Sequence, residues 1–337
     1  MDADSAPLTG VQQGMLVSGL GYPAQGFEFE QLQWEIQGPL QVDCLARAWE
    51  LVYQRHDALN LEVHWRGREL PEQRVSHTQP RLALEVVEDT DLQQRAHTLK
   101  GFLTRDRRLA PAADQPPLSR LTLLRFAEDD HVLVWSFLHL ILDGRSIAQV
   151  LDEVAQAYLA LCRQQTPELP PASSFLRHAR QRYTQTTVDP DFWRDYLQGF
   201  QQPNPLPTDP SATADREQRG YCASLQLPED LSGQLQQAAA NLGISLNNLL
   251  QGAWAQVLAN QTSDDDLVFG NIRSCRHGIQ ATACGMFMNL LPLRVQLRPG
   301  ATPRQILEQV REAQQQMRTR ELTPLQEISG LLDINTE

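Results

Sequence analysis

The stretch His131-Val-Leu-Val-Trp-Ser-Phe-Leu-His-Leu-Ile-Leu-Asp-Gly-Arg-Ser146 decides how this chain of 337 residues is organised. Its first part, 132–138, is an almost unbroken run of aliphatic, β-branched and aromatic residues, which is typical of a strand buried on both faces. The run ends at His139, and Asp143 and Gly144 follow it closely. The sequence therefore predicts a rigid strand that presents a histidine beside a sharp turn, an arrangement on which a precise site can be built.

A helix is expected directly after this turn. Ser146 and Gln149 have the spacing of a capping box, which marks the start of a helix. Apolar residues then recur on one helical face for four turns, at Ile147, Val150, Leu151, Val154, Tyr158 and Leu161. On the other side of the stretch, residues 118–126 precede a short polar turn, and they are expected to pair with the core strand as a hairpin.

Helical and strand-like patterns alternate along the rest of the chain, which predicts a mixed α/β fold. Prolines gather at 166–173 and again at 201–218, and both segments are interpreted as connectors. We therefore expect an N-terminal lobe over 1–172, which carries the histidine, and a C-terminal lobe over 173–337. Within the second lobe, a helix capped by Ser245 is predicted to turn these residues inward: Leu249, Leu250, Ala253, Val257 and Leu258.

The composition excludes several classes of function. The formal net charge is -12, which disfavours nucleic acid and anionic membranes as partners because both require a basic surface. Mean hydropathy is -0.40, and no apolar run approaches the length of a membrane span. The 5 cysteines include no CxxC pair or Cys/His cluster, so neither a disulfide framework nor a metal site is predicted and a cytoplasmic location is expected.

The segment Leu138-His139-Leu-Ile-Leu-Asp143-Gly144 resembles the HHxxxDG signature of the condensation domains of nonribosomal peptide synthetases. Other stretches resemble the same family in the same order along the chain. They are Pro7–Met15, Arg55–Leu59, Asp191–Leu197, Gln251–Trp254, Val268–Gly270 followed by Arg276, and Gly285–Val295. The resemblance covers the chain from residue 7 to about residue 332.

This resemblance implies a fold like that of chloramphenicol acetyltransferase, with two lobes arranged in a V and a tunnel between them. Donor and acceptor peptidyl carrier proteins would insert phosphopantetheine arms from opposite faces, so the domain itself is expected to bind no cofactor. The implied reaction is attack of the acceptor amine on the donor aminoacyl or peptidyl thioester, which gives an amide and a free thiol. An adjacent adenylation domain in a larger synthetase is expected as well.

The resemblance also assigns roles to individual residues. His139 matches the functional histidine, which would take a proton from the amine or position it and stabilise the tetrahedral intermediate. Histidine titrates near neutral pH, so it suits this task. Asp143 matches a structural aspartate that pairs with an arginine of the other lobe, and Arg276 is the candidate partner. Gly144 matches the glycine that gives the substrate arm room.

Two positions depart from the family pattern. Leu138 stands where the first histidine of the signature is expected, and Asn60 stands where a site-supporting arginine is expected. Phe287 and Asn289 are candidates for the lining of the tunnel. The last strands of the family's second lobe have no counterpart here, so the second lobe is expected to be truncated.

These departures leave alternatives to amide-bond formation. A modified condensation domain could dehydrate or otherwise process a carrier-bound serine or threonine, which the changes at Leu138 and Asn60 favour. A catalytically silent domain could dock carriers or other enzymes, although the retention of His139 with Asp143 and Gly144 disfavours this hypothesis. Plant-type acyltransferases that use coenzyme A share HxxxDG, but their second signature, Asp-Phe-Gly-Trp-Gly, is absent.

Overall fold

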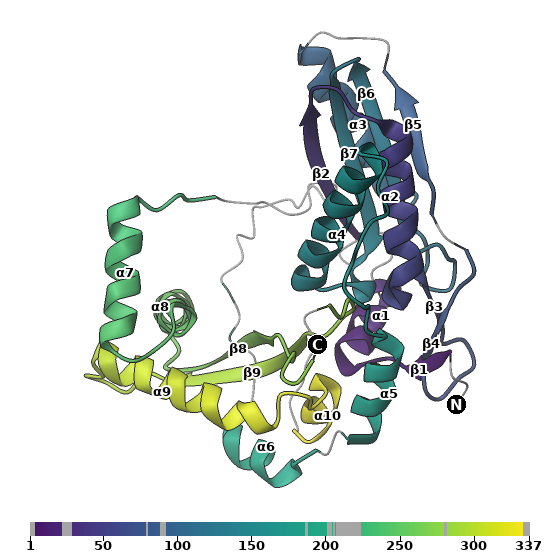
Figure 1. The fold of residues 1–337 in the computed structure, drawn as a ribbon. Helices are drawn as coiled ribbons and strands as arrows, with labels where there is room; N and C mark the ends of the chain where they lie inside the picture. The colour runs from purple at the N-terminus through teal and green to yellow at the C-terminus, as the bar shows by residue number, and fades with distance from the viewer. Residues whose placement is uncertain are drawn as a thin grey trace. The chain divides into compact units, whose positions relative to one another are not determined.

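The computed structural model of the protein describes residues 4–21, 29–78, 80–87, 92–185, 188–200, 204, 206, 224–279 and 282–332. The chain divides into two compact units (Figure 1), and helices and sheets occur in both, which confirms the mixed α/β class. Unit 1 comprises Met1–Thr186 and Ser274–Met288, and unit 2 comprises Thr187–Arg273 and Asn289–Glu337. Within the described residues, no helix combines the length and the apolar character needed to cross a bilayer.

This division differs from the expected boundary between residues 172 and 173. Helix α5 (Phe175–Gln185) belongs to unit 1 because the carboxylate of Asp57 accepts hydrogen bonds from the backbone N–H groups of Phe175 and Leu176, at 2.9 and 3.1 Å. The proline-rich segment before α5 therefore leads back into unit 1. Residues 274–288 also return to this unit, and local sequence patterns do not reveal that return.

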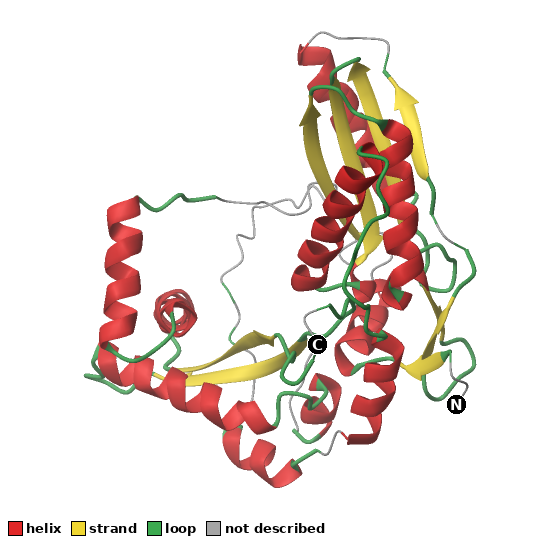
Figure 2. Ribbon diagram, in the orientation of Figure 1, coloured by secondary structure: helices red, strands yellow, loops and turns green. Residues whose placement is uncertain are grey.

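Unit 1 is built on a four-stranded sheet (yellow in Figure 2), whose strands are labelled in Figure 1 and follow the order β2-β7-β6-β5. Its strands are β2 (Phe29–Gln37), β5 (Leu82–Val86), β6 (Ser119–Ala127) and β7 (Asp130–Leu138). Strand β7 pairs antiparallel with both β2 and β6, and β5 lies parallel to β6. The predicted hairpin of β6 and β7 is thus confirmed.

Strand β7 is buried on both faces, as its apolar run predicted. Leu133, Trp135 and Phe137 point into the core formed with helices α2 (Val42–Arg55) and α4 (Gly144–Cys162). Val132 and Val134 point to the other face, which α3 (Leu92–Arg108) covers. Layers on both sides keep the strand rigid, so the position of its last residue is well defined.

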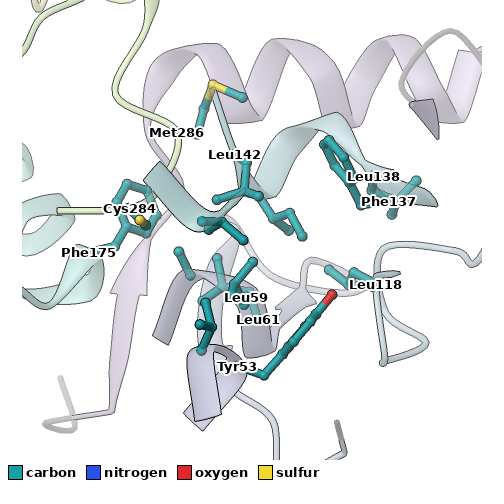
Figure 3. Close-up of a cluster of buried hydrophobic side chains, with 14 of the residues drawn as sticks. Tyr53, Leu59, Leu61, Leu118, Phe137, Leu138, Leu142, Phe175, Cys284 and Met286 are labelled. Carbon is teal, nitrogen blue, oxygen red and sulfur yellow. The ribbon is translucent and has the colours of Figure 1, made fainter. Parts of the chain in front are cut away.

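Smaller elements also belong to unit 1. They are β1 (Ser5–Pro7), α1 (Gly10–Gly21), the 3-10 turn η2 (Asp57–Asn60), β3 (Leu61–His64), β4 (Glu72–Val75) and the 3-10 turn η3 (His139–Ile141). Strands β1, β4 and β3 form a second, antiparallel sheet. Figure 3 shows that Cys284 and Met286 lie in the same apolar cluster as Leu59 and Leu142, so residues 274–288 belong to this core.

Unit 2 consists of a two-stranded antiparallel sheet and five helices within the described residues. They are α6 (Pro190–Tyr196), α7 (Glu229–Asn241), α8 (Leu246–Thr262), β8 (Asp266–Arg273), β9 (Asn289–Gln296), α9 (Pro303–Gln316) with the 3-10 turn η4 (Met317–Thr319), and α10 (Leu325–Gly330). Ser245 caps α8 as predicted, and Thr302 forms a capping box with Gln305 at the start of α9.

The predicted inward face of α8 is only partly correct: Leu258 is buried as predicted, whereas Leu250 and Val257 are not. Leu250 and Val257 expose 51% and 47% of their surface, and the helix buries Gly252 and Ala255 instead. A Cβ atom on Gly252 would lie 2.6 Å from a side chain of α9, so the two helices approach closely along the face of small residues. Helix α8 thus carries two apolar faces, and apolar spacing alone does not identify the one that packs against α9.

Candidate functional site

His139 stands at the end of β7, on the first residue of the 3-10 turn η3. Its Nδ1 atom lies 2.9 Å from the carbonyl oxygen of Leu142. A carbonyl only accepts hydrogen bonds, so Nδ1 is the donor and carries the proton. The neutral imidazole therefore has its lone pair on Nε2. The side chain is half-buried, and its Nε2 atom can accept a proton from a reacting group.

Asp143 is buried, and both of its carboxylate oxygens are occupied by hydrogen bonds within unit 1. Oδ1 accepts from the backbone N–H of Ser146 at 2.8 Å and from Nη2 of Arg276 at 2.7 Å. Oδ2 accepts from the backbone N–H of Phe287 at 3.2 Å. The carboxylate therefore caps helix α4 and anchors two residues of the 274–288 segment, which makes it a structural group.

The predicted helix start at Ser146 is wrong, because Asp143 is the N-cap and α4 begins at Gly144. The hydroxyl of Ser146 makes long-range contacts instead of closing a capping box. It donates to the carbonyl oxygen of Gly285 at 2.8 Å and accepts from Arg276 at 2.6 Å. Its partners lie more than a hundred residues further along the chain, so the local spacing with Gln149 could not reveal them.

Arg276 pairs with Asp143 from within unit 1, although the arginine was expected to come from the other lobe. Its Nη1 atom also donates to the carbonyl oxygen of Ala283 at 2.9 Å, and its guanidinium carbon lies 4.3 Å from the centroid of the Phe287 ring. The side chain is almost fully buried, with 6% exposed. One arginine thus ties the 274–288 segment to the first turn of α4, beside the histidine.

Gly285 lies where this segment crosses the start of α4. Its carbonyl oxygen accepts from the backbone N–H of Asp143 at 3.1 Å as well as from Ser146. Its φ angle is +155°, and an added Cβ atom would lie 2.2 Å from Cδ2 of Phe175. The close approach of the Phe175 ring therefore requires glycine at this position.

Replacing Gly285 with alanine is expected to lower the free energy of unfolding by about 1–3 kcal/mol, because the new methyl group displaces the Phe175 ring from a packed core. Urea denaturation measures the change. Gly144→Ala is the matched control, since an added Cβ at Gly144 meets nothing within 4 Å. Equal unfolding free energies for the two variants would contradict this account of Gly285.

The two positions that depart from the family pattern are both part of the packing of unit 1. Leu138 is 8% exposed and belongs to the main apolar core (Figure 3). Asn60 donates from Nδ2 to the carbonyl oxygens of Tyr53 and His56, at 2.6 and 3.1 Å. It therefore satisfies carbonyl groups at the C-terminal end of α2, which a helix end otherwise leaves without partners.

The two candidate tunnel residues lie in different units. Phe287 is fully buried and packs edge-on against Phe175, with 5.3 Å between the ring centroids, so it is a core residue of unit 1. Asn289 lies on β9 in unit 2 and donates to the carbonyl oxygens of Glu321 and Thr323, at 2.9 and 2.7 Å. The structure gives both side chains packing and anchoring contacts.

A buried ionic cluster beside α4 was not predicted from the sequence. Glu153 accepts hydrogen bonds from His56 Nε2 at 2.8 Å, Arg55 Nε at 2.9 Å and Gln149 Nε2 at 2.9 Å. The one available signal was that Glu153 interrupts the apolar face of the helix, three residues after Val150. The cluster joins the end of α2 to the middle of α4, the helix that Asp143 caps.

Burial alone would raise the pKa of Glu153, but the hydrogen bonds from His56, Gln149 and Arg55 outweigh it and lower the pKa to about 2. Cys284 lies 3.8 Å from His56 Nε2, and burial raises the pKa of its thiol to about 12. Both the raised pKa and the full burial of this thiol disfavour Cys284 as a nucleophile.

The lowered pKa of Glu153 makes stability depend on pH. Because the folded-state pKa lies below the ordinary value of 4.5, the stabilisation is fully present above pH 4.5 and is lost as the pH falls toward 2. Glu153→Gln should lower the free energy of unfolding by about 2–3 kcal/mol at neutral pH and by progressively less below pH 4.5. Urea denaturation at several pH values measures this, and a difference that does not vary with pH would contradict it.

Comparisons with known proteins agree with one another. The sequence profile of the family described as "Condensation domain" matches residues 2–337. The chain is 33% identical over 338 residues to one of the linear gramicidin synthase polypeptides of Brevibacillus parabrevis, which covers 96% of this chain and 4% of the relative. It is 27% identical over 333 residues to one of the mycosubtilin synthase polypeptides of Bacillus subtilis, covering 96% of this chain and 13% of the relative. The chain thus spans a small fraction of the length of these relatives.

Solved structures share the fold. The first condensation domain of the calcium-dependent antibiotic synthetase, in complex with a substrate analogue, superposes with a TM-score of 0.78 at 20% identity, covering 97% of this chain and 78% of that one. SgcC5 from Streptomyces globisporus gives a TM-score of 0.75 at 21% identity, covering 97% of this chain and 76% of that one. The expected fold class, that of the condensation domains with their resemblance to chloramphenicol acetyltransferase, is confirmed.

Proposed function

We propose that this chain, which belongs to the condensation domain family of nonribosomal peptide synthetases, forms an amide bond between a donor thioester and an acceptor amine held on carrier proteins. The 2.9 Å contact between Nδ1 of His139 and the carbonyl oxygen of Leu142 is the observation that carries the proposal. The Nδ1–H of His139 is committed to the carbonyl of Leu142, so the basic Nε2 atom is available to the substrate. The histidine also directly follows a strand that is packed on both faces, which fixes its position.

In the proposed reaction the acceptor nitrogen attacks the carbonyl carbon of the donor thioester and loses a proton to Nε2 of His139. The tetrahedral intermediate then collapses, the carbon–sulfur bond breaks, and the donor arm leaves as a thiol after it takes up the proton from Nε2, which returns His139 to its neutral form. Asp143 and Arg276 act as positioning residues, because their ion pair holds the turn on which His139 stands. Neither makes contact with the reacting atoms in this scheme.

Gly144 supports the approach of a phosphopantetheine arm to the site. It is exposed at the first position of α4, and a Cβ added there meets nothing within 4 Å. Internal packing therefore does not require glycine at this position. Because Gly144 has no side chain, a narrow substrate arm can approach the backbone near His139 more closely than it could at any other residue type.

The proposed partners are a donor and an acceptor carrier protein, with an adenylation domain in the same synthetase. Support comes from the relatives, which are synthase polypeptides many times longer than this chain. The phosphopantetheine is then part of the substrate and arrives with each carrier.

Incubation with a donor-loaded and an acceptor-loaded carrier, followed by release and mass analysis of the thioester products, tests the proposal. A dipeptide is expected only when both loaded carriers are present. A seryl- or threonyl-loaded carrier that loses one water without forming an amide would contradict the proposal and favour the dehydrating alternative. Carrier binding without any product would instead favour the docking alternative.

A further inference from the structure

Two partly exposed cysteines lie at the end of the α2–α4 pair that is opposite to Asp143. Cys44 is in the first turn of α2, and Cys162 is the last residue of α4. Figure 1 shows the two helices side by side on the sheet of unit 1, and they pack on each other. This pair of thiols takes no part in the proposed function.

Direct contacts bring the start of α2 to the end of α4. The backbone N–H of Gln41, the N-cap of α2, donates to the hydroxyl of Tyr158 on α4 at 3.2 Å. Cys44 follows Gln41 by three residues and also donates to its side chain at 3.4 Å. Cys162 follows Tyr158 by four residues and therefore lies on the same face of α4. Helical spacing thus places both thiols next to the same contact.

The electrostatics of the two thiols agree with this placement. Burial raises the pKa of Cys44, and the neighbouring Cys162 thiol raises it further. The Cys162 thiol also raises the pKa of Tyr158, after the larger effect of burial. Among the described cysteines, Cys275 and Cys284 differ from this pair because they are 2% and 0% exposed.

We propose that Cys44 and Cys162 form a reversible disulfide that clamps α2 to α4. The oxidant is a small disulfide such as oxidised glutathione. One cysteine thiolate attacks it, forms a mixed disulfide and releases one molecule of reduced glutathione. The second thiolate then attacks the protein sulfur of that mixed disulfide and releases the second molecule. The two cysteines lose two electrons and two protons in total, and oxidised glutathione takes up both.

The clamp would complete the attachment of the two helices. Arg55 and His56, at the end of α2, already bond Glu153 of α4, and the disulfide would fix the start of α2 to the end of α4. It closes a loop of more than a hundred residues, so the melting temperature of the oxidised protein should rise by about 5 °C or more. The disulfide should form faster at higher pH, because the thiolate is the reacting species.

The test uses the full chain carrying Cys222→Ser, because Cys222 lies outside the described residues and could compete for the oxidant. After treatment with oxidised glutathione, tryptic digestion without reductant should yield residues 1–47 linked to residues 146–163. The linked peptide should be two hydrogen atoms lighter than the sum of its parts. Dithiothreitol should separate the peptides and reverse the rise in melting temperature.

Cys44→Ser and Cys162→Ser, each in the same background, are the matched controls. Each should lose the linked peptide and the rise in melting temperature, and the remaining thiol should carry a glutathione adduct. Glutathione adducts on both cysteines of the parent protein without a linked peptide would overturn the proposal, as would two unmodified thiols.

Discussion

Replacing His139 with alanine is expected to lower the rate of amide formation by about 10²- to 10⁴-fold, the usual contribution of a general acid or base. The substitution removes the Nε2 atom that would accept the proton of the acceptor amine. It removes a half-buried side chain with one hydrogen bond to Leu142, so the fold should persist. The measurement is the single-turnover rate with loaded carriers, alongside circular dichroism to establish that the variant is folded.

His97→Ala serves as the control for His139→Ala. His97 is exposed on α3, on the face of the sheet opposite to α4, and should leave the rate unchanged. If a folded His139→Ala variant keeps a rate within about twofold of the parent, His139 is not the proton acceptor, since a general base contributes far more.

Replacing Arg276 with alanine is expected to lower the free energy of unfolding by about 3–5 kcal/mol, because it leaves the carboxylate of Asp143 buried without its cation. Two further bonds are lost with the side chain, one to Ser146 and one to the carbonyl of Ala283. Urea denaturation at neutral pH gives the value. This decrease in the free energy of unfolding should exceed the decrease caused by any surface substitution.

Arg145→Ala is the matched control for Arg276→Ala. Arg145 is exposed in the first turn of α4, two residues after Asp143, and its removal should change the free energy of unfolding by less than about 0.5 kcal/mol. If Arg276→Ala lowers the free energy of unfolding by less than about 1 kcal/mol, the ion pair with Asp143 does not hold residues 274–288 in place. Removing one partner of a buried pair is otherwise strongly destabilising.

The sequence predicted the strand and its histidine because their signal is local. An almost unbroken apolar run over 132–138 favours burial between two layers, and the structure places α3 on one face and α2 with α4 on the other. The hairpin with β6 follows from the short polar turn between two such runs. These features need no information from distant residues.

Features that depend on distant residues could not be predicted in the same way. Ser146 has the local spacing of a cap, yet its hydroxyl bonds Gly285 and Arg276, and Asp143 takes over the cap. The ion pair of Glu153 with Arg55 likewise joins two helices that are far apart in the sequence. Long-range polar contacts of this kind leave no periodic trace in the chain.

In the proposed reaction, this chain transfers a donor acyl group to an acceptor amine. An isotope-labelled donor on its carrier, mixed with an aminoacyl-loaded acceptor carrier, tests it most directly through the intact masses of both carriers. The label should move to the acceptor carrier through an amide bond, the donor carrier should end with a free thiol, and His139→Ala should block both changes. The proposed transfer would be contradicted if the label stayed on the donor carrier, whether or not the labelled group lost one water.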